Sequence, residues 1–350
     1  MKKSVLKITK TVSILAIAGF VLSGCAEPEP EPTPEAIVYP IAPLTGVAYL
    51  TDSDVPDTNS LSAVSCKIDN AAPGRPQFNL NKSDIVHVQM VEGGLTRLVA
   101  TWHSQPVDKV GPVRSVRPMD ADIAAAFGGI FCYSGGVDMF IALLQDTSLY
   151  LADENTQQSV TPNSFSRTPE RRAPHNMVVD MGLLQSQHPD LAAPQSIFSY
   201  AVLSSETGAY EPATTSTGKA MTDFTVKYPD ATSFWKGDGA GNLLRDQDGK
   251  PHLDAVSDEQ ISAKNVIVLQ VEIDSSIRDV RYGVIPKTIM IGSGKVWVFA
   301  DGKHVEGTWS KASQTSPFEL LDSTGAVIKL TPGNTWIELM APEANLTITP

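Results

Sequence analysis

Residues 85–103 read Ile-Val-His-Val-Gln-Met-Val-Glu-Gly-Gly-Leu-Thr-Arg-Leu-Val-Ala-Thr-Trp-His, and this stretch decides the fold. The runs 85–92 and 95–103 are rich in β-branched and aromatic residues, which favour strands. Gly93-Gly94 lies between them and suits a tight turn, because glycine adopts positive φ without steric cost. Two such runs joined by Gly-Gly predict a β-hairpin.

The segments around this hairpin combine further strands with helices. Pro118 suits the first turn of a helix, where its missing N–H is not needed. The other predicted elements of this region are strands at 64–68 and 130–133 and helices at 119–127 and 137–145. We therefore expect residues 43–189 to form a mixed α+β N-terminal domain.

The second half of the chain has a different pattern. Residues 190–222 are rich in Ser, Thr, Ala and Pro, and we interpret them as a connecting segment. Beyond them the pattern is almost purely β, with turns at 301–302 and 324–325. The predicted strands are 224–228, 265–273, 287–291, 295–299, 304–309, 318–321, 327–330 and 335–340. We expect a β-rich, mostly antiparallel C-terminal domain over 223–345, and an α+β fold class for the whole chain.

The composition excludes several classes of protein. The chain has 350 residues, 42% hydrophobic and 19% charged, which argues against global disorder. Its formal net charge of −12 makes nucleic acid an unfavourable partner. Three cysteines are too few for a disulfide-rich scaffold. Cys66 and Cys132 both lie in predicted strands, so they form a disulfide if those strands are adjacent and are buried free thiols otherwise.

The N-terminus has the pattern of a lipoprotein signal peptide. Lysines at positions 2, 3, 7 and 10 precede an apolar run over 12–22, which is too short for the roughly 20 residues of a spanning helix. The run ends in Leu22-Ser-Gly-Cys25, which matches the lipobox of bacterial lipoproteins. We predict cleavage after residue 24 and acylation of Cys25, palmitate included, which anchors the chain to the membrane.

An acidic spacer follows the predicted lipid anchor. Residues 26–35 alternate Glu and Pro, a composition that favours extended polyproline II structure, and we assign 25–42 to a spacer. Cleavage after residue 24 removes four lysines and no acid, which leaves 23 basic and 39 acidic residues and a net charge of −16. We expect the folded part to lie on the outer face of the bacterial cytoplasmic membrane.

Several polar motifs in a fixed order carry a family resemblance. They are Ile-Asp-Asn at 68–70, Val-Glu-Gly-Gly-Leu-Thr-Arg at 91–97, Gly-Pro-Val-Arg-Ser-Val-Arg-Pro at 111–118, Ser-Gly-Gly at 134–136 and Arg-Ala-Pro-His-Asn at 172–176. Further matches lie at 265–268, 292–295, 307–311 and 332–336. Together they resemble the YerB-like bacterial lipoproteins, a family with a domain of unknown function, DUF3048, in N- and C-terminal parts. The resemblance covers residues 43–342 and implies a two-domain envelope lipoprotein, but no activity.

Arg114 and Arg117 are the first candidate site residues. They lie three positions apart between two prolines, and guanidinium groups suit phosphate or carboxylate. Ser134-Gly135-Gly136 precedes a predicted helix, where backbone N–H groups also bind anions. The alternative for both arginines is an ion-pair network whose acids are Asp69, Glu92, Asp120 or Asp122.

His175 is the candidate general acid or base, because its ordinary pKa lies near neutrality. Asp69 or Glu92 would hold its second ring nitrogen, and Asn176 would orient the ring or bind substrate. The alternative is a structural loop histidine. Ser115 and Ser134 lack the Gly-x-Ser-x-Gly elbow of a nucleophile. Without His-x-x-x-His or Cys-x-x-Cys pairs we predict neither a metal site nor a cofactor.

These observations support three hypotheses about function. The first is a module that binds an anionic cell-envelope glycan or small molecule through an arginine-rich site. The second is a hydrolase or transferase acting on a phosphodiester or glycan, with His175 as acid or base. The third is a scaffold for envelope proteins. The predicted ligand-binding residues are Asn70, Arg75, Arg97, Arg114, Arg117, Ser134, Gly135, Gly136, Arg172 and Asn176.

Overall fold

A computed structural model describes residues 39–105, 107–341 and 346–350. The predicted signal peptide, Cys25 and most of the predicted spacer lie outside these residues. None of the helices in the described ranges is long and apolar enough to cross a membrane.

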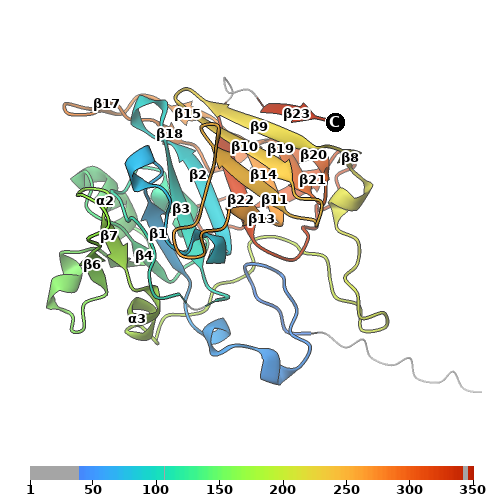
Figure 1. Ribbon diagram of the computed structural model, residues 1–350, viewed down its shortest axis with the longest axis horizontal. Helices are drawn as coiled ribbons and strands as arrows, with labels where there is room; N and C mark the ends of the chain where they lie inside the picture. The colour runs from blue at the N-terminus through green and yellow to red at the C-terminus, as the bar shows by residue number, and fades with distance from the viewer. Residues whose placement is uncertain (1–38, 106, 342–345) are drawn as a thin grey trace, which may run out of the picture. The chain divides into compact units, whose positions relative to one another are not determined.

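The 85–103 hairpin lies near the middle of an eleven-stranded sheet (Figure 1). Its strands pair antiparallel, with Ile85 opposite Thr101 and Met90 opposite Thr96, so the predicted hairpin is confirmed. Gly93 and Gly94 both have positive φ in the connection. The strands, in spatial order, are β21 (Glu319–Asp322), β20 (Lys303–Lys311), β19 (Gly292–Ala300), β14 (Asn265–Gln270), β22 (Thr335–Met340), β2 (Ile85–Met90), β3 (Thr96–Trp102), β1 (Val64–Ile68), β4 (Ile130–Cys132) and β5 (Tyr150–Ala152), with β8 (Lys219–Ala220) beside β20.

Strand β22 joins the two halves of the chain. It pairs parallel with β14 on one side and parallel with β2 on the other. The large sheet therefore continues without a break from strands of the first half to strands of the second half. The parallel pairs at β22 depart from the purely antiparallel order that short hairpins would produce.

A smaller sheet covers one face of the large sheet (Figure 1). Phe224 stacks on Phe299 with ring centroids 3.7 Å apart, and Trp235 meets Trp336 edge to face. The strands are β12 (Lys250–Pro251), β11 (Leu243–Gln247), β10 (Ala231–Gly237), β9 (Asp223–Tyr228) and β23 (Leu346–Thr349), with β13 (Ser262–Ala263) beside β11.

Both faces of the large sheet are buried. Along β14, Val266 and Val268 pack toward the smaller sheet, whereas Ile267 and Leu269 pack into a second core on the other face. Because side chains alternate across a strand, burial on both faces explains the continuous apolar runs of the central strands.

The predicted α+β N-terminal domain is wrong, since the structure is dominated by β-sheet. In the described residues only three α-helices occur, and they are α1 (Asp120–Ala124), α2 (Asp138–Gln145) and α3 (Met181–Ser186). Every residue of α1 is buried, and Gly128 and Gly129 with positive φ turn the chain back into β4. The apolar spacing of this segment fits a helix, but packing against the large sheet keeps the helix short.

The remaining elements are small. Three two-stranded ribbons pair β6 (Phe165–Arg167) with β7 (Met177–Val179), β15 (Ile273–Asp274) with β18 (Lys287–Thr288), and β16 (Arg278–Asp279) with β17 (Gly283–Val284). Short 3-10 helices include η3 (Ala72–Gly74) and η5 (Glu92–Gly94). The predicted strand at 327–330 forms only isolated bridges, at Val327 and Leu330.

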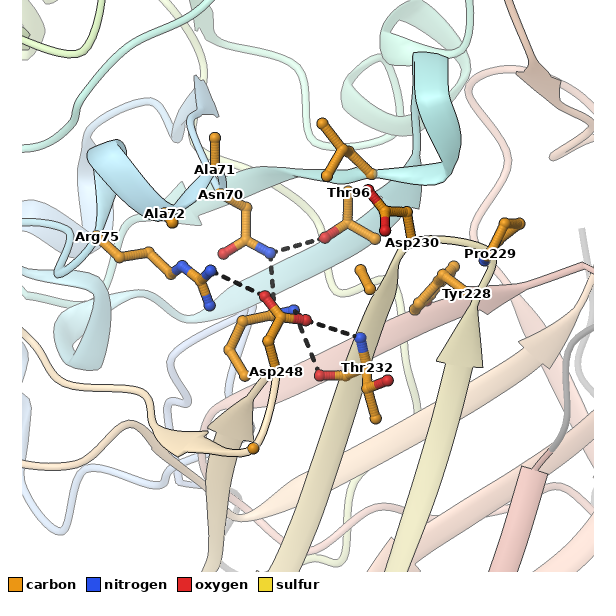
Figure 2. Close-up of a pocket in the computed structure, with 14 residues that line it drawn as sticks. Asn70, Ala71, Ala72, Arg75, Thr96, Tyr228, Pro229, Asp230, Thr232 and Asp248 are labelled. Atoms are coloured by element: carbon orange, nitrogen blue, oxygen red, sulfur yellow. Dashed lines mark hydrogen bonds and ion pairs between the residues drawn. The ribbon is translucent and has the colours of Figure 1, made fainter.

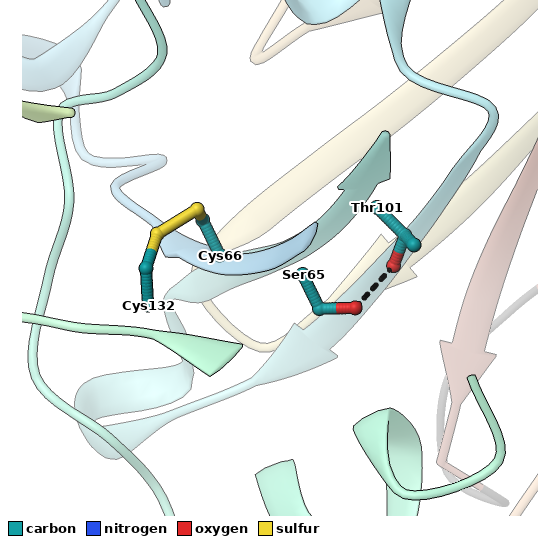
Figure 3. The surroundings of a disulfide bond; sticks show 4 residues. All are labelled: Ser65, Cys66, Thr101 and Cys132. Atoms are coloured by element: carbon teal, nitrogen blue, oxygen red, sulfur yellow. Dashed lines mark hydrogen bonds between the residues drawn. A yellow bond between two sulfur atoms is a disulfide. The ribbon is translucent and has the colours of Figure 1, made fainter. Parts of the chain in front are cut away.

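A disulfide ties β1 to β4 (Figure 3). Cys66 and Cys132 face each other in the parallel register of these strands, with Cα atoms 4.5 Å apart, and both are fully buried. Of the two states that the sequence left open, the structure has the disulfide. It fixes the strand whose end carries Asp69.

Candidate functional site

Asp69 comes directly after β1, where the chain leaves the sheet. Its backbone N–H donates to the Pro112 carbonyl at 2.9 Å, and its side chain is almost fully buried. A Cβ atom at Gly74 would lie 2.7 Å from the Asp69 Cγ, so only glycine lets the 3-10 helix η3 approach this closely. The loop 69–76 is therefore packed around one carboxylate.

An arginine and a histidine meet this carboxylate, and we call Asp69, Arg114 and His175 the Asp69 cluster. The Asp69 Oδ2 atom lies 2.6 Å from His175 Nδ1 and 3.3 Å from Arg114 Nε, while Oδ1 accepts from the Ala71 N–H. Arg114 Nη1 donates to the Pro174 carbonyl. Because a carboxylate only accepts, the Nδ1 of His175 carries a proton and its Nε2 points away from Asp69.

The Asp69 cluster is partly open to solvent. The side chains of His175 and Arg114 are 22% and 18% exposed, whereas that of Asp69 is 2% exposed. Within the described residues, neither His175 Nε2 nor Arg114 Nη2 has a hydrogen-bond partner. The cluster thus presents two nitrogen groups oriented by one buried acid.

Arg117 and Arg97 are bound to protein acceptors instead. Arg117 Nε lies 2.7 Å from Glu92 Oε1 and 2.9 Å from Oε2, and its Nη1 donates to the Val116 carbonyl. Arg97 Nη1 donates to the Ser115 carbonyl. Burial and the nearby charges of Arg117 and Arg114 together lower the pKa of Arg97 to about 10. The three arginines gather, but Glu92 pairs with Arg117 and not with His175.

The Ser134 region lies next to Arg114. The Ser134 N–H donates to the Arg114 carbonyl, and its hydroxyl donates to Glu154. A Cβ atom at Gly136 would lie 2.3 Å from Val116 Cγ1, so this glycine permits close packing. Gly135 has positive φ in the turn before α2.

The remaining predicted residues are spread around this site. Asn176 accepts from Arg167 Nη1 at 3.0 Å, and Arg172 is exposed. Arg75 pairs with Asp248 from the second half of the chain at 2.8 Å. Among the described residues, no three His, Cys, Asp or Glu side chains are placed to hold a metal ion.

Arg171 was not among the predicted site residues, although it stands beside Arg172 in the same motif. Its Nη1 donates to the Gly74 carbonyl at 2.7 Å, and its guanidinium lies 4.7 Å from the Phe78 ring centroid. It therefore joins the segment that carries His175 to the loop that packs around Asp69. Two adjacent arginines look alike in sequence, and only the fold distinguishes them.

A buried ring of hydrogen bonds begins at the neighbouring residue, Asn70, and we call it the polar ring. It joins Arg245, His252, Gln77, Asn70 and Gln247, none of which is more than 4% exposed. Arginine only donates, so Arg245 Nη1 donates to His252 Nδ1 at 2.6 Å, and the ring proton of His252 is on Nε2. That proton is donated to Gln77 Oε1 at 2.6 Å.

The polar ring then closes on Gln247. Gln77 Nε2 donates to Asn70 Oδ1 at 3.2 Å, and Asn70 Nδ2 donates to Gln247 Oε1 at 3.0 Å. Arg245 Nη2 donates to the same Gln247 oxygen at 2.7 Å. Arg245 cannot accept a hydrogen bond, and the direction of every bond in the ring follows from this. The amide orientations of both glutamines and the asparagine and the tautomer of the histidine are therefore fixed.

Glu338 on β22 supplies the negative charge for this buried group. Its Oε1 accepts from Trp235 Nε1 at 3.0 Å and lies 3.8 Å from Arg245 Nε, and its Oε2 accepts from the Tyr228 hydroxyl at 2.8 Å. Both Arg245 and Glu338 are fully buried between the two sheets. Burial, with the charges of Arg245 and Arg75, lowers the pKa of His252 well below its ordinary value.

Of the polar ring, only Asn70 is among the residues that the sequence predicts to bind a ligand. Arg245, His252, Gln247 and Gln77 belong to none of the motifs that carry the family resemblance. Polar residues at alternating positions of a strand predict an exposed face, so their burial has no local signal. Only the packing of the second sheet against the first buries them.

The fold and the Asp69 cluster define a two-sheet, disulfide-containing β protein with a partly open carboxylate–histidine–arginine site. The chain belongs to the DUF3048 family of proteins of unknown function: residues 44–193 match the family's N-terminal domain and 224–337 its C-terminal domain. The predicted relationship to the YerB-like family is therefore confirmed.

Two comparisons with individual proteins agree with this membership. The chain is 24% identical over 335 residues to the Bacillus subtilis (strain 168) protein named "Putative lipoprotein YerB", and the match covers 94% of each chain. It is also similar to the crystal structure of YerB from Bacillus subtilis, with a TM-score of 0.70 and 20% identity over 88% of this chain and 99% of that one. The second comparison shows a shared fold.

Proposed function

We propose that the protein is a lipid-anchored extracytoplasmic lipoprotein that binds an anionic cell-envelope ligand at the Asp69 cluster. The lipobox at Cys25 and the name of the Bacillus subtilis relative support the anchor. The acidic spacer supports a folded part that stands off the outer face of the cytoplasmic membrane.

One observation carries the ligand site. The buried Asp69 carboxylate orients both Arg114 and His175, and a nitrogen of each is left without a partner among the described residues. Both side chains are partly exposed, and Arg172 adds an exposed positive charge in the same segment as His175. Positioned guanidinium and imidazole groups bind phosphate or carboxylate through charge-assisted hydrogen bonds.

We restrict the proposed anion site to one of the three clustered arginines, Arg114. Arg97 and Arg117 donate to protein carbonyls and to Glu92, whereas Arg114 contacts Asp69, so we limit the proposed ligand contacts to Arg114 and His175. We assign them the role of raising the local positive potential around Arg114. An Arg117→Ala change is therefore expected to reduce stability more than ligand affinity.

The ligand site is tested by titration of the full-length protein in detergent with glycerol phosphate, a phosphate-bearing probe. We expect Arg114→Gln and His175→Gln each to weaken binding about tenfold, which corresponds to about 1.4 kcal/mol. Arg278→Gln, which alters an exposed arginine on β16, is the control and should bind as the parent does. Equal affinity in all four proteins would exclude the Asp69 cluster as the site.

A second candidate function is hydrolysis or group transfer at a phosphodiester or glycan, with His175 as general acid or base. It is favoured by the 2.6 Å contact of Nδ1 with a buried carboxylate, which leaves Nε2 to move a proton. Turnover of bis(p-nitrophenyl) phosphate that disappears in His175→Gln and falls in Asp69→Asn would support this reaction. Binding of glycerol phosphate without any turnover supports the binding function instead.

The anchor has a separate test. Cells that express the full-length chain are labelled with radioactive palmitate, and the label is expected on the parent protein. Cys25→Ala should remove the label, because the acylated thiol is then absent. The double variant Cys66→Ala with Cys132→Ala serves as control, since it keeps Cys25 and leaves no unpaired thiol from the disulfide. Label that persists in Cys25→Ala would contradict the lipid anchor.

A further inference from the structure

A cavity lies beside Asn70, the residue that follows Asp69 in the chain, and we call it the junction pocket (Figure 2). Its walls come from the loop after β1, the start of β3, the β9–β10 turn and the β11–β12 turn. Its volume is about 670 Å³, within the range of small-molecule sites. The pocket therefore lies where the first half of the chain meets the second sheet.

The polar ring fixes the inner wall of this pocket. Asn70 and Gln247 line the pocket and are also members of the ring, and Asn70 Nδ2 donates to the Thr96 hydroxyl at 2.8 Å. Gln247 Nε2 donates to Asp248 Oδ1 at 2.8 Å. These side chains cannot rotate without breaking buried hydrogen bonds, so the wall is preorganised.

Several polar groups of the wall keep bonding capacity for a ligand. Thr96 accepts from Asn70, and its hydroxyl proton has no acceptor among the described residues. Within the part of the chain that the structure describes, the guanidinium of Arg75 donates through Nη2 alone, to Asp248, which leaves its other N–H groups. Asp230 is exposed at the rim with a carboxylate that accepts hydrogen bonds. The pocket thus offers donors and acceptors side by side.

The charges of the junction pocket differ from those of the Asp69 cluster. Arg75 is neutralised by Asp248, and Asp230 adds a further negative charge. A phosphate or carboxylate would be repelled here. Leu95, which is 41% exposed, and Pro229 add an apolar surface to the same cavity.

We propose that the junction pocket binds an uncharged saccharide, at a site distinct from the anion site. Sugar hydroxyls both donate and accept, which suits the alternating carboxylate, guanidinium and hydroxyl groups of Asp230, Arg75 and Thr96. The C–H face of a sugar ring suits the surface of Leu95 and Pro229. This inference does not depend on the anionic ligand of the Asp69 cluster.

The test is a titration of the full-length protein with triacetylchitotriose, a neutral saccharide with hydroxyl and amide groups, followed by ligand-observed NMR. We expect saturable binding that Asp230→Asn and Arg75→Gln each weaken about fivefold. Asp230 is exposed, so its variant should fold as the parent does. Asp190→Asn, at another exposed aspartate, is the matched control and should bind normally.

Three outcomes would overturn the proposal. They are no binding up to about 10 mM probe, binding that Asp230→Asn and Arg75→Gln both leave unchanged, and binding that Arg114→Gln abolishes. The last result would place the saccharide at the Asp69 cluster. A parallel titration with glycerol phosphate, which Asp230→Asn should not weaken, separates failure of this site from failure of the anion site.

Discussion

The molecule contains two groups of one histidine, one arginine and one carboxylate, in contrasting surroundings. In the first, His252, Arg245 and Glu338 lie fully buried between two sheets. In the second, the Asp69 cluster, His175 and Arg114 are partly exposed around a buried aspartate. The same three residue types therefore occur once inside the protein and once at its surface.

The two groups differ in how many of their nitrogen and oxygen atoms already have hydrogen-bond partners within the protein. In the buried group both nitrogens of His252 have partners, Arg245 donates to three side chains, and Glu338 accepts from Tyr228, Ser233 and Trp235. Among these side chains Arg245 Nε lacks a hydrogen-bond partner within the described residues, while the other contacts form a network that specifies the packing of the sheets. In the Asp69 cluster two nitrogens have no partner among the described residues, and our proposal of a ligand site rests on these nitrogens.

The largest expected effect comes from breaking the buried group. Arg245→Met should lower the free energy of unfolding by about 3–5 kcal/mol, because it leaves a buried Glu338 without its cation and three acceptors without their donor. Urea denaturation measures this loss. A loss below about 1 kcal/mol would contradict a structural role for the buried group.

Loss of the disulfide should have the next largest effect. Cys66→Ala with Cys132→Ala opens a loop of sequence separation 66 and should cost roughly 2–4 kcal/mol. Glycerol phosphate affinity of the folded variant should stay within about twofold, since Asp69 is also held by Pro112 and Gly74. A stability equal to that of the parent under oxidising conditions would show that the bond does not constrain the chain.

The pH dependence of stability should report on the buried His252. The pKa of His252 is lowered well below its ordinary value in the folded state, so the unfolded chain binds a proton that the folded chain does not. The contribution of the neutral His252 to the free energy of unfolding is present above about pH 6.5. It is lost as the pH falls, by about 1.4 kcal/mol per pH unit. In His252→Gln the free energy of unfolding should depend less steeply on pH, because the unfolded chain then binds one proton fewer.

The comparison of His252→Gln with the parent isolates this effect. Burial raises the pKa of Asp84 to about 6, and this group acts with the opposite sign, since its folded form gains a proton below pH 6 and is stabilised. His87, whose burial lowers its pKa to about 3, adds to the His252 slope in both proteins. Identical slopes between pH 7 and 5 would contradict a buried neutral His252.

The smallest expected change in the free energy of unfolding comes from a substitution in the Asp69 cluster. Arg114→Met should change the free energy of unfolding by less than about 1 kcal/mol, because its side chain is partly exposed and water replaces the lost contacts. The same change from arginine to methionine at Arg245 and at Arg114 thus compares the two groups directly by the stability that each loses. A loss at Arg114 as large as at Arg245 would assign both groups to the structural core.

The sequence predicted much of the large sheet and little of the second one. The hairpin over 85–103 and the strand at 335–340 have strong apolar and β-branched patterns, and both form. The strands β10 and β11 have no such signal, because Ser233, Arg245 and Gln247 are polar residues in buried positions. The α+β assignment failed because the apolar spacing of short segments such as α1 also fits a longer helix. The length of the helix depends on how the segment packs, which the spacing does not report.

The candidate site shows the same division. The sequence placed Asp69, Arg114 and His175 among its candidates by residue type, and tertiary structure decided that His175 meets Asp69 and that Glu92 meets Arg117. Residues 68–76 and 171–176 are far apart in the chain, and no local pattern reports their contact. Ion pairs between distant loops depend on the distance and burial of two atoms, which only the folded chain defines.

The sequence by itself determined the family, the acidic composition and the hairpin that organises the large sheet. These properties depend on residue type and local spacing, which the printed chain already contains. The tertiary structure alone decided that β22 enters between strands of the two halves, that the polar ring is closed and that the Asp69 cluster is open. The physical reason is that pairing between distant strands and burial of polar groups are long-range properties, set by which surfaces exclude water from one another.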